Sequence, residues 1–392
     1  MIPSQTQAEA IPAAAMDEIA RLLQTGDLFR YTSDASPVSL LEAEFAALLG
    51  AKYALAVSSC SAALFLSMKA LDLPAGARVL IPAFTFAAVP SAVVHAGCMP
   101  VLAECGDDLR LDMGDFGAKL PGCAAVIISH MRGHTSDMDA IMALCDAAGV
   151  PVIEDAAHSL GTTWAGQNIG TLGRVGCFSF QSYKMVNAGE GGILISDDPD
   201  LIARAVIMSG AYEHNWKKHP VLQTAFARHQ NRLPLYNLRM NSLSAAVIRP
   251  QLPALARRVA DGRRNHDHVA SRLNASPWFA VPPALPQEVR APDSIQFLMS
   301  GLDAGLAPAL TRTAAASGVT LQVFGQSTDN ARAFWNWQFL GPVPDLPKTR
   351  AMLMRTCDLR LPVQLSLAQC DALADAVLEA AAEVARDQSA AA

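Results

Sequence analysis

The sequence lacks the features that would assign it to several common classes of protein. None of its eight cysteines forms a C-x-x-C pair, and a chain of 392 residues is too large to depend on a disulfide framework. The formal net charge of -6 contains no long block of one sign, which argues against nucleic acid as a partner. No Lys or Arg precedes Arg21 and no continuous apolar run lies near it, so a secretory signal is not expected. We therefore expect a cytoplasmic protein with reduced thiols.

An uninterrupted apolar run of membrane-spanning length is also missing. The segment Val79–Leu102 comes closest, but Pro82, Pro90 and Pro100 interrupt it. A buried strand, a helix and a second strand explain the segment better. No membrane partner is expected.

What is present is a series of short apolar runs separated by longer stretches of helical character. The runs are continuous, which is typical of strands buried on both faces, and the stretches between them supply crossover helices. This pattern predicts an α/β fold with a mainly parallel central sheet flanked by helices. The runs are residues 54–57, 79–82, 100–104, 124–129, 151–155, 176–180 and 191–196.

After about Pro250 the alternation of apolar runs and helical stretches gives way to a charged helix, proline-rich turns and short strand candidates. We expect a second, smaller α/β domain there. The boundaries are 1–250 for a large domain with an N-terminal arm and 251–392 for the small domain. The alanine-rich end at 388–392 is expected to fray. The small domain should contain a charged amphipathic helix at 252–273, a strand at 294–299 and a last helix at 367–384.

The strongest chemical signal is Lys184, which lies between the run 176–180 and a glycine-rich turn at 187–192. Ligands of parallel sheets collect at the carboxyl ends of the strands. A lysine desolvated in such a cleft has a lowered pKa and a neutral amine that can attack an aldehyde. A lone lysine is more often a solvated side chain, so the interpretation depends on its neighbours.

Asp155 and His158 follow another apolar run. At the end of a strand, Asp155 could pair with a protonated pyridine nitrogen and so keep the ring an electron sink. Equally, it could cap a following helix. His158 could lie over that ring or bond its phenolic oxygen, or it could be structural.

A candidate phosphate site runs through Ser59, Cys60 and Ser61, between a strand and a helix. Free N–H groups and the dipole at a helix start suit an anion. The alternative is an ordinary N-cap.

Together these pieces resemble the DegT-type sugar aminotransferases, which are pyridoxal-5'-phosphate (PLP) enzymes of fold type I. The resemblance is densest from Leu41 to Leu252. It implies a fold type I PLP-transferase, the cofactor PLP, and a small-molecule amino donor and keto acceptor as partners. The matching segments are 58–64, 81–86, 154–158, 178–184 and 237–240.

The resemblance also implies a role for each matching residue. Lys184 would form the Schiff base, Asp155 would hold the pyridinium, and His158 would bond the ring oxygen. Phe86 would stack on the ring. Asn237 would reach the phosphate of the neighbouring subunit, which implies a homodimer with shared active sites. Phosphate ligands would come from Ser59, Cys60, Ser61 and Ser179.

The sequence departs from the family pattern at several positions. Cys60-Ser61 replaces the usual Gly-Thr. Arg132 stands where an apolar or aromatic residue is more usual, and it could pair with a substrate anion or be structural. The segment 208–219 replaces a familiar Arg-Asn-His-Gly segment and weakens any assignment of a nucleotide-sugar substrate. Candidate substrate contacts are Arg132, Tyr212, His214 and Arg239.

The function implied is transfer of an amino group from glutamate or glutamine to a ketone of a sugar, possibly nucleotide-linked, or of a cyclitol. Two alternatives stay open: other PLP chemistry such as dehydration, and a PLP-binding regulator without turnover. The family's sugar dehydratases carry histidine in place of the lysine, so Lys184 argues against that version. No metal is expected, because His266 and His268 would face different sides of a helix.

Overall fold

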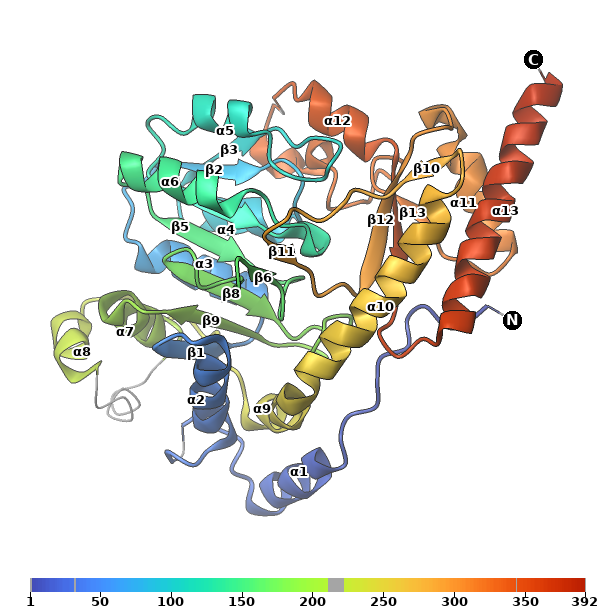
Figure 1. Cartoon of the computed structure of the whole chain (residues 1–392). Helices are drawn as coiled ribbons and strands as arrows, with labels where there is room; N and C mark the ends of the chain where they lie inside the picture. The colour runs from blue at the N-terminus through green and yellow to red at the C-terminus, as the bar shows by residue number, and fades with distance from the viewer. Residues whose placement is uncertain (1, 32, 211–221, 343, 392) are drawn as a thin grey trace.

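A seven-stranded sheet organises the first part of the chain (Figure 1). The structure is a computed structural model that describes residues 2–31, 33–210, 222–342 and 344–391. The strand order is β1-β9-β8-β5-β4-β2-β3, and only β9 runs antiparallel to its neighbours. The strands are β1 (Tyr53–Val57), β2 (Arg78–Pro82), β3 (Met99–Ala103), β4 (Ala125–Ser129), β5 (Val152–Asp155), β8 (Val175–Ser179) and β9 (Gly192–Ser196).

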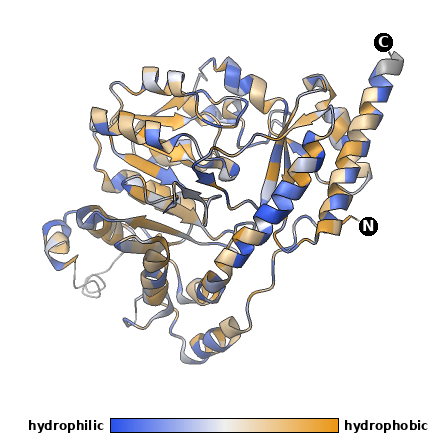
Figure 2. Ribbon diagram, viewed as in Figure 1, coloured by the Kyte–Doolittle hydropathy of each residue, from blue (hydrophilic) through white to orange (hydrophobic). Residues whose placement is uncertain are grey.

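The sequence-based prediction of this sheet is confirmed. Each of the seven apolar runs forms a strand whose ends agree to within one residue. Every residue of β4, β8 and β9 is buried, which explains why these runs are continuous rather than alternating. Figure 2 shows the same sheet coloured mainly as hydrophobic. The segment 79–102 folds as β2, α4 and β3, as expected.

Helices connect the parallel strands and cover the sheet. Helix α3 packs against α4 and α7, and α5 packs against α6. No helix of the described residues is long and apolar enough to cross a membrane. The helices of this part are α1 (Ala14–Thr25), α2 (Pro37–Leu49), α3 (Cys60–Ala70), α4 (Ala88–His95), α5 (Met113–Lys119), α6 (Met138–Ala148), α7 (Pro199–Met208), α8 (Gln223–His229) and α9 (Ser242–Ile248).

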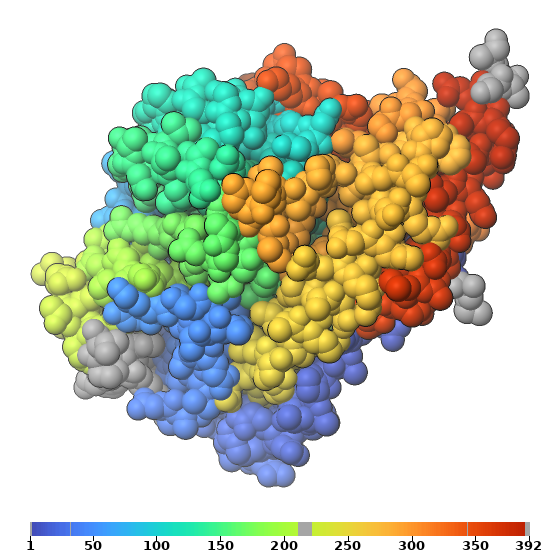
Figure 3. Space-filling model, in the orientation of Figure 1, coloured from blue at the N-terminus to red at the C-terminus, as the bar shows by residue number. Residues whose placement is uncertain are grey.

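An antiparallel sheet of order β10-β12-β14-β13 forms the C-terminal part. A small three-stranded sheet, β11-β6-β7, joins it to the first part, and Figure 3 shows the contact between these regions. The elements are α10 (Leu255–Asn274), β10 (Phe279–Ala280), β11 (Glu288–Val289), β12 (Ser294–Met299), α11 (Ala307–Ala316), β13 (Gln322–Val323), α12 (Pro347–Leu353), β14 (Thr356–Arg360) and α13 (Leu367–Ala391), with β6 (Thr163–Trp164) and β7 (Gln167–Asn168).

Two expectations for this part need correction. The helix expected at 252–273 begins as a 3-10 segment, Arg249–Ala254, and only α10 is α-helical, because Pro253 cannot donate a backbone hydrogen bond. The last helix is longer than expected, since α13 continues to Ala391, and the fraying expected at 388–392 stays a prediction. Alanine has the highest helix propensity, which accounts for the longer helix. The strand at 294–299 is confirmed as β12.

The buried apolar side chains form two clusters. The larger belongs to the seven-stranded sheet and its helices, and it also includes Phe324, Phe334 and Trp337. The smaller cluster lies between the antiparallel sheet and α10, α11 and α13. A segment of the C-terminal part that contains these three aromatic residues thus packs into the core of the seven-stranded sheet. The domain boundary at 250/251 stays a prediction. All eight cysteines are buried and free.

The N-terminal arm crosses from α1 to the C-terminal part, where the N-terminus lies near α13 (Figure 1). Gln5 anchors it: Gln5 Nε2 donates to the Gly318 carbonyl at 3.2 Å, and Gln5 Oε1 accepts from the Thr320 amide at 3.0 Å. Glu9 forms ion pairs with Arg257 and Arg258. The residues between these anchors are therefore held against the cleft between the two sheets.

Candidate active site

The chemically important residues meet at one edge of the seven-stranded sheet. Asp155 ends β5, Ser179 ends β8, and Ser59 follows β1, so the parallel strands deliver all three to their carboxyl edge. The antiparallel β9 places its first residue, Gly192, in the same row, opposite Val57 and Ser179. A Cβ atom at Gly192 would lie 2.2 Å from the Ser59 carbonyl carbon. Glycine is required there for the start of α3 to approach β9.

Ser59 caps α3, which agrees with the simpler of the two interpretations of this segment. Its Oγ accepts from the Ala62 amide at 3.1 Å. The positive end of the α3 dipole nevertheless points at the same sheet edge, where it favours an anion. Cys60 is buried beneath this turn, whereas Ser61 is exposed. Small residues, a helix start and the nearby Ser179 hydroxyl suit a phosphate group.

Asp155 is buried and held from two sides. Its Oδ2 accepts from the Ser129 hydroxyl at 2.8 Å, and its Oδ1 accepts from the Ala157 amide at 3.2 Å. Cys60 Sγ lies 3.8 Å from Oδ1. The residues after Asp155 form turns, so the helix that it might have capped is not there. A fixed carboxylate at this position suits a protonated pyridine nitrogen.

Lys184 and His158 are in direct contact. Lys184 Nζ lies 2.8 Å from Nε2 and 3.2 Å from Nδ1 of His158. Burial, opposed by Asp293 and reinforced by Arg132, lowers the pKa of Lys184 to about 8. Burial and the charge of Lys184 lower the pKa of His158 well below its ordinary value. A neutral imidazole can accept a hydrogen bond from the lysine.

Lys184 opens into a cavity of about 310 Å³ between the two parts of the chain. Of the residues singled out in the sequence, Arg132, His158 and Lys184 line it. The C-terminal part and the N-terminal arm supply residues that sequence reasoning missed. These are Gln5, Thr6, Thr320, Gln322, Arg332, Asp358 and Arg360. The one available signal was a pair of charged residues inside the apolar strand run at 356–361.

Arg132 enters this cavity from an unusual backbone conformation. Its φ of 55° and ψ of 24° lie in the left-handed region, which is uncommon for a residue other than glycine. The side chain is buried and forms an ion pair with Asp358 of β14. Arg132 therefore joins the two parts of the chain at the candidate site. Because its guanidinium already pairs with Asp358, a substrate anion would have to share Arg132 with that carboxylate.

Phe86 lies on a second cavity, of about 680 Å³, and does not line the cavity at Lys184. Its side chain is 45% exposed. Two residues, Gln322 and Arg332, line both cavities, so the two spaces adjoin. An exposed ring beside the reactive lysine's cavity is available to stack on a planar group.

The remaining predicted residues lie outside both cavities or outside the described residues. Asn237 is exposed, and its neighbour Arg239 bridges to Val57 at the end of β1. Arg239 Nη1 donates to the Gly210 carbonyl at 3.0 Å and lines neither cavity. Tyr212 and His214 are outside the described residues.

The donor set fits PLP: an amine of lowered pKa, a buried carboxylate and a helix start lined with small residues converge at one sheet edge. This fold and this site define the class of PLP-dependent enzymes of fold type I. The chain belongs to the DegT/DnrJ/EryC1/StrS aminotransferase family, whose model matches residues 11–378.

Individual relatives agree with this membership. The chain is 33% identical over 265 residues to the spore coat polysaccharide biosynthesis protein SpsC of Bacillus subtilis (strain 168), which is 67% of this chain and 66% of that protein. It is 35% identical over 217 residues to GDP-perosamine synthase of Vibrio cholerae, which is 55% of this chain and 56% of that protein. The matched regions span less than two thirds of these relatives' own length.

Solved structures match over nearly the whole chain. The aminotransferase TlmJ from Streptoalloteichus hindustanus gives a TM-score of 0.84 at 24% identity and covers 98% of this chain and 100% of its own. The 3-amino-5-hydroxybenzoic acid synthase gives a TM-score of 0.84 at 25% identity, with coverage of 98% and 99%. The first of these likenesses, being under 25% identical, speaks for the fold alone.

Proposed function

We propose that the chain is an aminotransferase that moves an amino group from glutamate or glutamine to a ketone of a sugar, possibly nucleotide-linked, or of a cyclitol. The observation that carries the proposal is the contact between Lys184 Nζ and the neutral His158 ring, in a cavity beside Asp155. Relatives named for amino-sugar synthesis, including a UDP-N-acetyl-3-dehydro-alpha-D-glucosamine 3-aminotransferase of Acidithiobacillus ferrooxidans, support the acceptor class.

Lys184 is proposed as the residue that attaches the cofactor aldehyde. When bound, PLP supplies an electron sink for the carbon that gains or loses the amino group. Lys184, once free, would accept a proton at Nζ from that carbon and deliver it to the former aldehyde carbon of the cofactor, on the other side of the transferred nitrogen. His158 accepts a hydrogen bond from Nζ and thereby orients the lysine. No second base is needed for this exchange.

The other site residues are proposed to bind the cofactor. Asp155, fixed by Ser129 and Ala157, would face the pyridine nitrogen and keep it protonated. Phe86 would stack on the ring. The phosphate would lie at the start of α3 and beside β8, on Ser59, Cys60, Ser61 and Ser179.

We also propose a cytoplasmic homodimer with shared active sites and with domains at 1–250 and 251–392. The exposure of Asn237 in the single chain supports the first point, because an asparagine that reaches a second subunit must face outward. Arg239, Tyr212 and His214 stay candidates for substrate contact. Light scattering of the purified protein would test the dimer.

The visible absorption spectrum of the protein with added PLP tests the central proposal. We expect a band that is absent from Lys184→Ala and kept by Lys52→Ala, which removes an exposed lysine of the same chain. Glutamate or glutamine should bleach the band. A band without any response to donors would favour other PLP chemistry or a regulator, and a band that does not need Lys184 would refute the assignment of the lysine.

A further inference from the structure

The cavity at Lys184 is rich in arginine, and the charges of these side chains are only partly balanced. Arg132 pairs with Asp358. Arg360 Nη1 lies 3.7 Å from Asp293 Oδ2. These two arginines thus have internal partners that hold them in place.

Arg332 differs from both. Among the described residues the Arg332 guanidinium forms no ion pair, whereas the other two do. Its buried Nε has no hydrogen-bond partner, a property that it shares with the Nε atoms of Arg132 and Arg360. The ring centroid of Phe324 lies 5.7 Å from Arg332 Cζ and offers only a weak cation-π contact. Burial and the neighbouring charge of Arg132, opposed by the charge of Asp358, lower the pKa of Arg332 to about 10. Arg332 is half-buried, and a half-buried cation without an ion-pair partner costs stability, so its retention points to a ligand.

The position of Arg332 indicates which ligand it meets. Arg332 and Gln322 are the residues common to the cavity at Lys184 and to the larger cavity at Phe86. A donor the size of glutamate fits within the cavity at Lys184, which measures about 310 Å³. A larger molecule with its ketone at Lys184 would extend into the second cavity and pass directly beside Arg332.

We propose that Arg332 binds an acidic group, a carboxylate or a phosphate, of the keto acceptor. The planar guanidinium presents paired N–H donors that match either group, and burial strengthens the contact. This inference rests on the proposed aminotransferase function and narrows its acceptor to an acidic sugar or cyclitol. The positive charge of Arg132 repels that of Arg332. An acidic group that binds here would relieve this repulsion, so the pair of arginines favours an anion.

The effect of replacing Arg332 on stability distinguishes an arginine that binds a ligand from one that only supports the fold. If Arg332 is held ready for a ligand, replacing it with glutamine removes a half-buried charge that has no ion-pair partner, and the melting temperature should rise or stay unchanged. If Arg332 supports the fold, the melting temperature should fall. The proposal therefore expects Arg332→Gln to fold normally. Arg332→Lys serves as a second variant that keeps the charge.

Calorimetry with paired acidic and neutral sugars tests the proposal. The probes are D-glucuronate, glucose 6-phosphate and D-glucose, titrated into the protein saturated with PLP. We expect each acidic sugar to bind at least ten-fold more tightly than glucose. Arg332→Gln should lose about ten- to hundred-fold of that affinity with no change for glucose, and Arg332→Lys should recover part of it. Arg263→Gln, which removes an exposed arginine of α10, should match the wild type.

Three results would overturn the proposal: equal affinity for acidic and neutral sugars, no detectable binding of either acidic sugar, or a fall in melting temperature for Arg332→Gln. A loss of glutamate affinity in Arg332→Gln as large as the loss for glucuronate would also overturn it, because the arginine would then serve the donor. Calorimetry needs no turnover. A missing Lys184-dependent band would therefore refute the proposed function separately from this result.

Discussion

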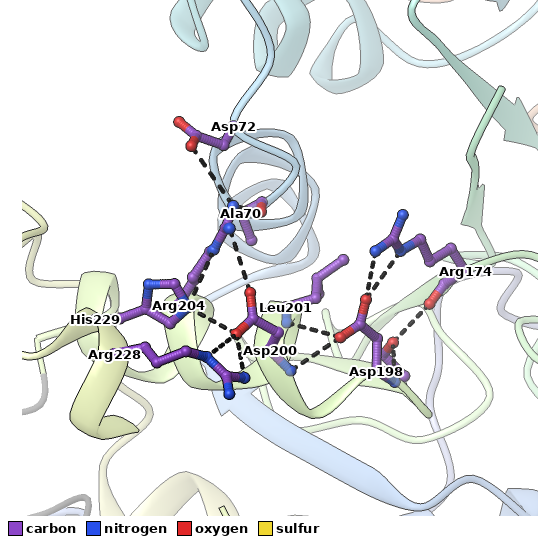
Figure 4. A network of polar contacts seen from close by, with 10 residues as sticks. Ala70, Asp72, Arg174, Asp198, Asp200, Leu201, Arg204, Arg228 and His229 are labelled. Carbon is purple, nitrogen blue, oxygen red and sulfur yellow. Dashed lines mark hydrogen bonds and ion pairs between the residues drawn. The ribbon is translucent and has the colours of Figure 1, made fainter. Parts of the chain in front are cut away.

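Two clusters of charged side chains in this molecule are built in opposite ways. On the surface, Asp200 of α7 accepts from Arg228 and His229 of α8 and also pairs with Arg204, while the neighbouring Asp198 pairs with Arg174 (Figure 4). Each of these basic side chains has a carboxylate partner. The cluster at Lys184 is largely buried and has more arginines than close carboxylates, and among the described residues it leaves Arg332 without an ion pair.

The difference teaches how to separate structural charge from functional charge in this fold. Solvent screens the surface network, so its pairs contribute little each and serve to fasten α7 to α8. The buried cluster cannot rely on solvent, and an unpaired guanidinium there costs stability. A buried charge without an ion pair is therefore a better indicator of a functional site than a paired surface charge. Variants in the two clusters should differ in how much stability or activity they lose.

The largest effect is expected from Asp358→Asn, which breaks the buried pair with Arg132. Removing one partner of a buried ion pair leaves an uncompensated charge and costs about 3–5 kcal/mol. The free energy of unfolding in urea measures the loss. The double variant Arg132→Met with Asp358→Leu should recover much of it. A single variant as stable as the wild type would show that this pair behaves like the pairs on the surface.

Asp155→Asn should affect chemistry rather than folding. The amide keeps the shape and can still interact with Ser129, but it cannot hold a proton on the pyridine nitrogen by charge. The rate at which glutamate bleaches the cofactor band should fall about 10²- to 10³-fold, which is the usual cost of losing one well-placed electrostatic partner. Asp34→Asn, at an exposed carboxylate, is the matched control. Equal rates in both variants would remove Asp155 from the site.

These two aspartates also show what the sequence could and could not provide. Asp155 was predictable, because it ends a continuous apolar run in a pattern typical of parallel sheets. Asp358 was not, because its importance depends on Arg132, 226 positions away in the chain. Local sequence patterns specify strands and the residues at their ends, whereas pairing across two sheets depends on packing that no local pattern encodes.

The same limit explains the other differences. Asp155 ends β5, His158 follows it and Lys184 follows the neighbouring strand β8, so their closeness could be expected from the order of the strands, whereas their roles stay a prediction. The arm residue Gln5 and the C-terminal Arg332 reach the cavity only through the folding of distant segments. Phe86 was expected over the reactive site, and the structure places it on the adjoining cavity.

The pKa of Lys184 predicts how cofactor attachment depends on pH. Only the neutral amine attacks an aldehyde, and burial lowers the pKa of Lys184 to about 8. The rate at which the protein without cofactor gains its visible band should rise about ten-fold per pH unit below 8 and level off above it. Stopped-flow absorbance measures this. Since Arg132 also lowers this pKa, Arg132→Met should move the profile to higher pH. A profile that still rises steeply above pH 9 would mean that Lys184 is not desolvated as the structure indicates.

The smallest loss of stability is expected from a variant in the surface network around Asp200. A large loss there would directly contradict the contrast between the two clusters. Burial opposes ionisation of Asp200, but the hydrogen bonds from Arg228 and His229 outweigh it and lower the pKa of this carboxyl. A lowered pKa contributes stability above the ordinary carboxyl pKa, and this contribution is lost as the pH falls through the folded value.

Asp200→Asn should therefore cost about 1 kcal/mol near neutral pH, less in high salt, and nothing in acid, with no change in cofactor binding. Urea unfolding at two salt concentrations and two pH values measures the four cases. If the cost instead persisted in high salt or reached that of Asp358→Asn, the network would be acting as a buried one. Unpaired charge would then no longer distinguish the site at Lys184 from the rest of the molecule.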